Sequence, residues 1–172
     1  MAQRTFIAYS SADPFVADTI VNAAAMARTA EIEYEPWSRN DVSGQPIDQS
    51  VFSWVEQADS FVADVSEPNH NVTYEVGLAI GLAKPTRLIR AANKDRKALE
   101  AIGLLHNIGH DDYSSGAGLV EVLKRRPTVA PWPVAKKNRE QSVYFIQPST
   151  VDDVSSRLLS GIKRLFEKGL NA

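Results

Sequence analysis

The sequence contains no cysteine among its 172 residues, which excludes a disulfide-stapled scaffold and a metal site built on thiolates. Long hydrophobic runs are also absent, because no stretch approaches the ~18 apolar residues that a membrane-spanning helix needs. The first residues, MAQRTFIAYSS, lack the apolar core of a signal peptide. We therefore expect a cytoplasmic protein that does not enter a membrane.

The chain also lacks an excess of charge of either sign. Its formal net charge is -2, so bulk electrostatics give no reason to expect nucleic acid or an anionic membrane surface as a partner. No glycine-rich phosphate-binding loop is present, so any phosphate group would be held by backbone N–H groups at helix starts. We expect neither a cofactor nor a metal ion.

What the sequence does contain is a regular alternation of strand and helix patterns. Strands are predicted at residues 5–10, 31–37, 60–66, 86–92 and near 110–115, and helices at 12–27, 47–58, 71–83, 94–102 and 117–126. Asp13 is placed to cap the first of these helices, with Pro14 at its first position. This alternation predicts an α/β protein with a flavodoxin-like parallel sheet of about five strands and helices on both faces.

The composition changes after the last predicted helix. We expect a first domain over residues 1–126, a linker rich in proline and basic residues over 127–142, and a C-terminal strand–helix extension over 143–172. Residues 144–162 can be laid on residues 5–23, with Phe145 on Phe6 and Asp152 on Asp13. The tail is therefore either an added β-α unit or the opening of a truncated second domain.

Three polar segments follow the first three predicted strands: YSSAD (9–13), WSRNDVSGQ (37–45) and SEPNHN (66–71). Ligands of open parallel sheets collect at the carboxyl ends of the strands, so we expect these segments to converge on one site. Glu75 lies four residues after Asn71, on the same face of the predicted helix 71–83.

Glu75 has two interpretations at this point. An acid near a helix start is commonplace, because the helix dipole stabilises it by ~0.3–1 kcal/mol. The surrounding helix, however, is almost wholly apolar, so we expect it to be covered on most sides. A buried carboxylate without partners costs several kcal/mol, and such a cost is typical of a functional site. Asp64 is either a second functional carboxylate or a satisfied strand-end group, and we favour the second interpretation.

The segments RTFIAYSSAD, NDVSGQPIDQSVFSWVEQADSFVADVS and NVTYEVGLAIGLAKP together resemble the bacterial TIR domain and its sister group, the nucleoside 2-deoxyribosyltransferase-like proteins. The resemblance covers residues 4 to about 123. It implies that Glu75 is the catalytic glutamate and that the substrate is NAD⁺ or a related nucleotide. The implied reaction breaks the nicotinamide–ribose bond through an oxocarbenium-like state that one carboxylate can stabilise.

The resemblance also implies a set of substrate-binding positions: Tyr9, Ser10, Ser11, Trp37, Asp41, Ser66 and Asn71. The first three would line the ribose pocket, and the last two would shape the wall beside Glu75. Trp37 and Asp41 would belong to a loop that covers the site and contacts a second subunit, so a homo-oligomer is expected. Trp37 is open to two interpretations, stacking on a base or packing half-buried.

Three functions from different classes remain. The leading one is an NAD⁺ glycohydrolase of bacterial antiphage defence that self-assembly activates. The segment NVTY before Glu75 is nearer to the deoxyribosyltransferase pattern, which favours the alternative of a nucleoside or nucleotide N-glycosidase or 2-deoxyribosyltransferase. The bases released by such an enzyme need protonation, so it should carry a second functional carboxylate. The third is a non-catalytic TIR scaffold.

Overall fold

The computed structural model describes residues 2–39, 47–100, 102, 105, 107–125 and 127–131. The chain divides into two units, Met1–Val134 and Ala135–Ala172, and the described residues all belong to the first. The predicted extension over 143–172, its repeat and most of the predicted linker lie outside the described residues.

The elements in chain order are β1 (Gln3–Ala8), α1 (Pro14–Ala27), β2 (Ile32–Pro36), the 3-10 turn η1 (Trp37–Arg39), α2 (Ile47–Gln57), β3 (Ser60–Asp64), α3 (His70–Gly81), β4 (Thr86–Ala91), α4 (Lys97–Glu100), β5 (His110–Tyr113) and α6 (Gly116–Lys124).

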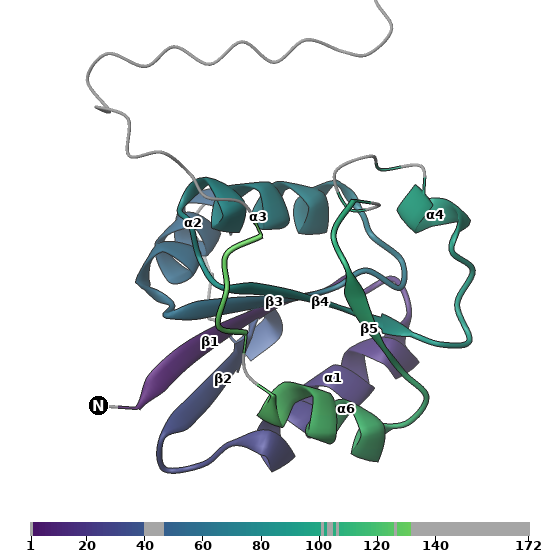
Figure 1. Ribbon diagram of the computed structural model, residues 1–172, viewed down its shortest axis with the longest axis horizontal. Helices are drawn as coiled ribbons and strands as arrows, with labels where there is room; N and C mark the ends of the chain where they lie inside the picture. The colour runs from purple at the N-terminus through teal and green to yellow at the C-terminus, as the bar shows by residue number, and fades with distance from the viewer. Residues whose placement is uncertain are drawn as a thin grey trace, which may run out of the picture. The chain divides into compact units, whose positions relative to one another are not determined.

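The five strands form one parallel sheet in the order β2-β1-β3-β4-β5, which confirms the predicted flavodoxin-like fold. Helices α2 and α3 lie on one face of the sheet, and α1 and α6 lie on the other (Figure 1). In β1, Phe6 and Ala8 pack on the α2–α3 side, while Ile7 and the following Tyr9 pack on the α1–α6 side. Because helices cover both faces, the strand reads as an unbroken apolar run rather than an alternating one.

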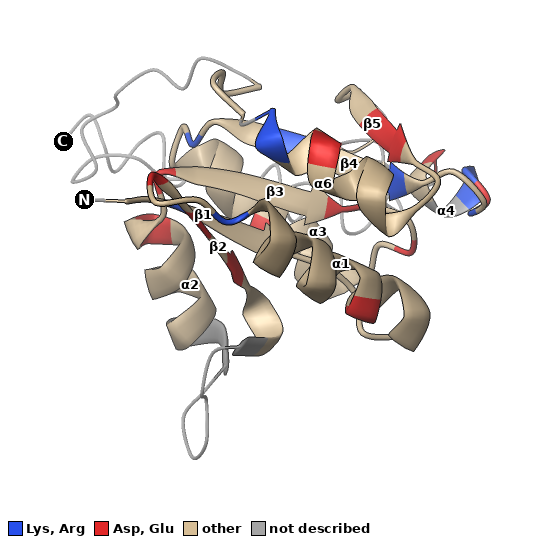
Figure 2. Ribbon diagram, turned by 90° about the horizontal axis from the view of Figure 1, so that it is seen from below, with Lys and Arg blue, Asp and Glu red and all other residues tan. Residues whose placement is uncertain are grey.

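Helix α1 begins where the sequence predicted. Asp13 is its N-cap and accepts hydrogen bonds from the backbone N–H groups of Phe15 (2.9 Å) and Val16 (3.4 Å), with Pro14 at the first helical position. Helices α1 and α3 each contain a single Asp, Glu, Lys or Arg, which is Asp18 in α1 and Glu75 in α3. Figure 2 shows the one acidic segment of α1 on an otherwise uncharged ribbon.

Helix α3 differs from its prediction in two ways. It begins at His70, one residue earlier than expected, because Asn69 rather than a later residue caps it and accepts from the Val72 N–H at 2.9 Å. It also buries one face instead of being covered on most sides, since Tyr74 is 55% exposed. The buried face consists of Val72, Glu75, Val76 and Ala79.

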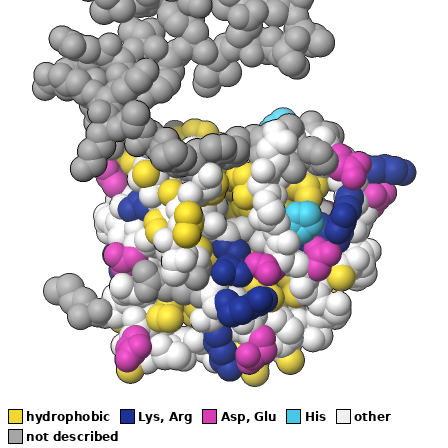
Figure 3. All heavy atoms as spheres, in the orientation of Figure 1, with side chains coloured by type: hydrophobic (Ala, Val, Ile, Leu, Met, Phe, Trp, Pro, Cys, Tyr) yellow, Lys and Arg dark blue, Asp and Glu magenta, His cyan; other side chains and the backbone are white. Residues whose placement is uncertain are grey.

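The edge strand β5 is lined with ion pairs to its neighbour β4. Arg90 holds Asp112 through two hydrogen bonds of 2.9 and 2.8 Å, and Arg87 pairs with Asp111 at 2.5 Å. Figure 3 shows basic and acidic side chains interleaved near a histidine on one face of the molecule. Charged side chains on an edge strand disfavour its pairing with a strand of another chain.

Candidate active site

The candidate site lies at the carboxyl edge of the sheet, between β1 and β3. These strands are neighbours, and the chain leaves them in opposite directions, β1 toward β2 and β3 toward β4. Such a reversal opens a crevice outside the strand ends, where ligands of open α/β sheets bind. The polar segments after β1 and β3 meet there: Asn69 Nδ2 donates to Ser10 Oγ at 3.4 Å. The expected convergence of these two segments is therefore confirmed.

Glu75 occupies the second turn of α3, and the residue is only 7% exposed. No hydrogen bond or ion pair joins its carboxylate to another residue of the described part of the chain. Burial raises the pKa of the Glu75 carboxyl from 4.5 to about 7. The ionised carboxylate loses hydration by burial, and no partner in the described part of the chain offsets this cost. A buried and costly charge of this kind is typical of a functional site.

Ser10 and Asn69 connect the loop after β1 to the start of α3. Ser10 is buried, and its Oγ accepts from the Ala12 N–H at 3.2 Å as well as from Asn69. Asn69 therefore fixes the start of the helix that carries Glu75 and ties it to the loop after β1. Its role was missed because Asn69 and Asn71 are equally good caps in sequence, and only the contact with Ser10 distinguishes them.

Tyr9 and Trp37 form a second contact at this edge, between the ends of β1 and β2. Their ring centroids are 5.8 Å apart, Trp37 Nε1 donates to the Tyr9 carbonyl at 2.9 Å, and the Tyr9 hydroxyl is hydrogen-bonded to Ser38 Oγ. Trp37 is half-buried and packs against core residues on both faces of the sheet. This geometry agrees with the packing interpretation of Trp37, and the bond through Nε1 fixes the orientation of its ring.

Asp64 is fully engaged at the end of β3. It accepts hydrogen bonds from the Ser66 N–H (3.0 Å), the Ser66 hydroxyl (3.0 Å) and the Tyr113 hydroxyl (2.9 Å). Burial raises the pKa of Asp64, and these three donors oppose the rise. Ser66 also accepts from the Ala91 N–H at 2.7 Å, so its side chain connects β3 to β4. The prediction of a satisfied strand-end group at Asp64 is confirmed.

The other predicted site residues are not drawn together by the described contacts. Ser11 and Asn71 are both exposed, so Asn71 is not buried beside Glu75 as the shared helical face suggested. Asp41 and the rest of the 40–46 loop lie outside the described residues.

A charged cluster that the sequence did not indicate joins three strand ends. Lys94, after β4, places its Nζ 2.6 Å from Asp13 Oδ2 and 2.5 Å from Glu67 Oε1. Asp13 follows β1 and Glu67 follows β3. The three residues are 27 to 81 positions apart in the sequence, so no local pattern predicts their contact.

Within the described part of the chain, no three His, Asp or Glu side chains are grouped so as to hold a metal ion. The same residues include no helix with the length and apolarity required to cross a bilayer.

The known proteins that resemble this chain include enzymes that cleave N-glycosidic bonds. No protein-family model matches the chain. A segment of 57 residues is 40% identical to the 5-hydroxymethyl-dUMP N-hydrolases of Rattus norvegicus and Mus musculus. That segment amounts to 33% of this chain and 35% of the rat protein, so the match spans about a third of the length of these curated relatives.

The structure of the CMP N-glycosidase from Clostridium botulinum superimposes with a TM-score of 0.51 at 16% identity, covering 72% of this chain and 99% of that one. The fold is shared with an N-glycosidase. A 2-deoxyribosyltransferase from Bacillus psychrosaccharolyticus is also similar, at a TM-score of 0.48 and 9% identity, which is too low to argue from. The resemblance is thus supported at the level of a fold shared with an N-glycosidase, whereas its assignment to the TIR branch stays a prediction.

Proposed function

We propose that this protein is a nucleotide N-glycosidase, which hydrolyses the bond between the anomeric carbon of the sugar and the base of a nucleoside 5′-monophosphate. The observation that carries the proposal is Glu75, a buried carboxylate without a partner among the described residues, on the helix that leaves β3 at the reversal point of the sheet. The short match to 5-hydroxymethyl-dUMP N-hydrolases and the fold shared with a CMP N-glycosidase support it.

The chemistry requires little beyond a well-placed negative charge. As the bond between C1′ and the base nitrogen breaks, its electron pair leaves with the base and positive charge develops on the sugar. An ionised Glu75 stabilises that charge, and does so more strongly in a crevice of low dielectric constant than it would in water. Water then bonds through its oxygen to C1′, and one of its protons ends on the released base.

The proton for the leaving base does not come from Asp64 in this proposal. All three contacts of Asp64 are with donors, so its carboxylate acts as an acceptor. The second functional carboxylate expected for this class of enzyme is therefore not Asp64, and the proton on the released base comes from the attacking water.

The comparisons favour a nucleotide N-glycosidase over the NAD⁺ glycohydrolase that the sequence resemblance suggested first. Cleavage of NAD⁺, a role in antiphage defence and activation by self-assembly stay predictions. An assay of the released base distinguishes cleavage of NAD⁺ from cleavage of a nucleotide, because the two reactions release different products.

The test incubates the purified full chain separately with CMP, 5-hydroxymethyl-dUMP, a deoxynucleoside plus an acceptor base, and NAD⁺, and measures free base by chromatography. We expect release from a monophosphate, at least 100-fold slower in Glu75→Gln, on the order of the loss when one transition-state contact is removed. Glu121→Gln, at an exposed acid of α6, is the matched control and should be unaffected.

Full activity of Glu75→Gln would refute the mechanism. Release of nicotinamide alone would restore the NAD⁺ assignment, and transfer to the acceptor base without hydrolysis would identify a deoxyribosyltransferase. Inactivity on all four substrates would favour the scaffold function.

A further inference from the structure

A second cavity opens at the same edge of the sheet but on the α1–α6 side. It has a volume of about 440 Å³ and lies between the start of α1, the carboxyl ends of β4 and β5, and the start of α6. Glu75 is not among its lining residues. Its volume falls within the range of small-molecule sites.

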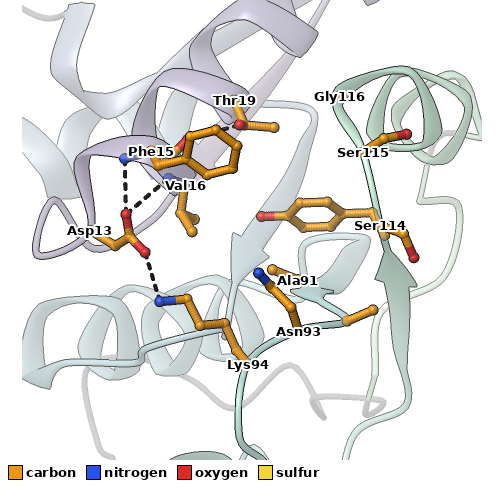
Figure 4. Close-up of a pocket in the computed structure, with 12 residues that line it drawn as sticks. Asp13, Phe15, Val16, Thr19, Ala91, Asn93, Lys94, Ser114, Ser115 and Gly116 are labelled. Atoms are coloured by element: carbon orange, nitrogen blue, oxygen red, sulfur yellow. Dashed lines mark hydrogen bonds and ion pairs between the residues drawn. The ribbon is translucent and has the colours of Figure 1, made fainter.

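An exposed aromatic ring stands at the mouth of this cavity. Phe15 is 76% exposed, while the neighbouring α1 residues Val16 and Ile20 supply the buried face of the helix. The ring is attached to rigid backbone, because the Phe15 N–H donates to Asp13 and the Phe15 carbonyl accepts from Thr19 Oγ1 at 2.8 Å. Figure 4 shows the Phe15 ring on one side of the opening, with Asn93 and Ser114 on the other. The core does not use this ring, so it is available for stacking.

Polar groups on the opposite wall are free to meet a ligand. Asn93 and Ser114 are exposed, and neither side chain is hydrogen-bonded to another residue of the described part of the chain. The Asn93 amide offers both donors and an acceptor, which suits the hydrogen-bonding edge of a heterocycle. Ser115 is already occupied, because its Oγ caps α6 through the Gly118 N–H at 3.1 Å.

The charge around the cavity argues against an anionic ligand. Lys94 lines the wall, but its ammonium group is already paired with Asp13 and Glu67. Two carboxylates around one ammonium leave a net charge of -1 on this cluster, so a phosphate group placed here would be repelled. An uncharged planar ring with donors and acceptors on its edge fits the exposed Phe15 ring and the Asn93 amide of this wall.

We propose that this cavity is a binding site for an uncharged nucleobase or nucleoside, separate from the site of Glu75, in which the ring stacks on Phe15 and its edge bonds to Asn93. The proposal goes beyond the proposed function, because it concerns binding rather than cleavage and uses none of the residues assigned to the reaction.

The test is calorimetric titration of the full chain carrying Glu75→Gln, which removes turnover, with cytosine, adenine, cytidine and adenosine as probes. We expect at least one probe to bind, and the comparison of base with nucleoside shows which form is preferred. Adding Phe15→Ala should weaken binding about tenfold, since stacking of a base on an aromatic side chain contributes ~1–3 kcal/mol. Asn93→Ala should weaken binding as well, and Phe15→Tyr should restore it.

Phe52→Ala, which removes a partly exposed ring on α2, is the matched control and should bind like its parent. Because Phe15 is exposed, its substitution should leave the melting temperature unchanged.

Absence of binding at millimolar probe, or unchanged affinity in both Phe15→Ala and Asn93→Ala, would overturn the proposal. It would also be overturned if Phe15→Ala in the otherwise unaltered chain abolished base release, because the cavity would then be the substrate site. The binding titrations involve no turnover, so their result does not depend on the proposed function.

Discussion

The ammonium nitrogen of Lys94 lies 2.6 Å from Asp13 Oδ2, while Asp13 Oδ1 caps helix α1. Asp13 therefore caps the start of helix α1 with one carboxylate oxygen. With the other oxygen it joins the loop after β1 to the loop after β4. The contact of Lys94 with Glu67 extends this connection to the loop that leads from β3 into α3. The neighbouring carboxylates raise the pKa of Lys94, so it stays protonated throughout the physiological range.

Lys94→Met is expected to lower kcat/KM for base release by roughly tenfold, because loss of the bridge frees the loop that positions α3 and Glu75. Lys94 is a positioning residue in this account and does not touch the substrate. Steady-state kinetics should show the loss, and Lys94→Arg should recover part of it. Lys124→Met, which removes an exposed pair within α6, should change nothing. Equal rates for Lys94→Met and the unaltered protein would show that the bridge has no role in the reaction.

Glu75→Gln is expected to stabilise the protein at pH 8 but not near pH 4.5. The pKa of Glu75 is about 7 in the folded state against 4.5 for the ordinary group, so the folded protein binds the extra proton between these values. Its free energy of unfolding therefore falls as the pH rises through this window, in total by on the order of 3 kcal/mol. Urea denaturation of both proteins at the two pH values measures the difference.

The control for this measurement is Glu121→Gln, which replaces an exposed acid and should shift stability little at either pH. If Glu75→Gln proved no more stable than the unaltered protein at pH 8, the carboxylate would not carry the burial cost assigned to it.

Base release is expected to increase with pH across about pH 7. The proposed mechanism needs Glu75 ionised, and burial places its pKa at about 7. A plot of kcat/KM against pH from 5 to 9 should thus rise and then level off. A profile that falls through the same range would instead assign Glu75 as the acid that protonates the leaving base.

Tyr113→Phe is expected to destabilise the fold by about 2 kcal/mol, since it removes one of the three donors to the buried carboxylate of Asp64. The ring of Phe fills the same space, so the loss is confined to the hydrogen bond. Urea denaturation of this variant can be compared with Tyr74→Phe, which alters an exposed tyrosine of α3 and should have almost no effect. Similar midpoints for the two variants would contradict the role given to Asp64.

Much of the architecture could be predicted because its signals are local. Strands were predicted at residues 5–10 and 60–66, and the corresponding β1 and β3 lie inside the sheet. Asp13 and Pro14 predicted the start of α1 to the residue. Pro36 ends β2, and β2 lies at the edge of the sheet, where a residue without a backbone N–H is tolerated.

The start of α3 shows where local signals cease to be sufficient. Asn69 and Asn71 are alike as capping residues, so sequence alone does not choose between them. The hydrogen bond from Asn69 to Ser10, across 59 positions, accompanies capping by Asn69 and leaves Asn71 exposed.

By itself the sequence determined the order of strands and helices, the parallel sheet and the helix on which Glu75 lies, because hydrophobic periodicity and capping act over a few neighbouring residues. Tertiary structure alone decided that Glu75 is buried without a described partner, that Asp64 is satisfied by Tyr113, and that Lys94 joins Asp13 to Glu67. Those facts depend on contacts between strand ends far apart in the chain, and the desolvation of a charge is set by everything that surrounds it in space.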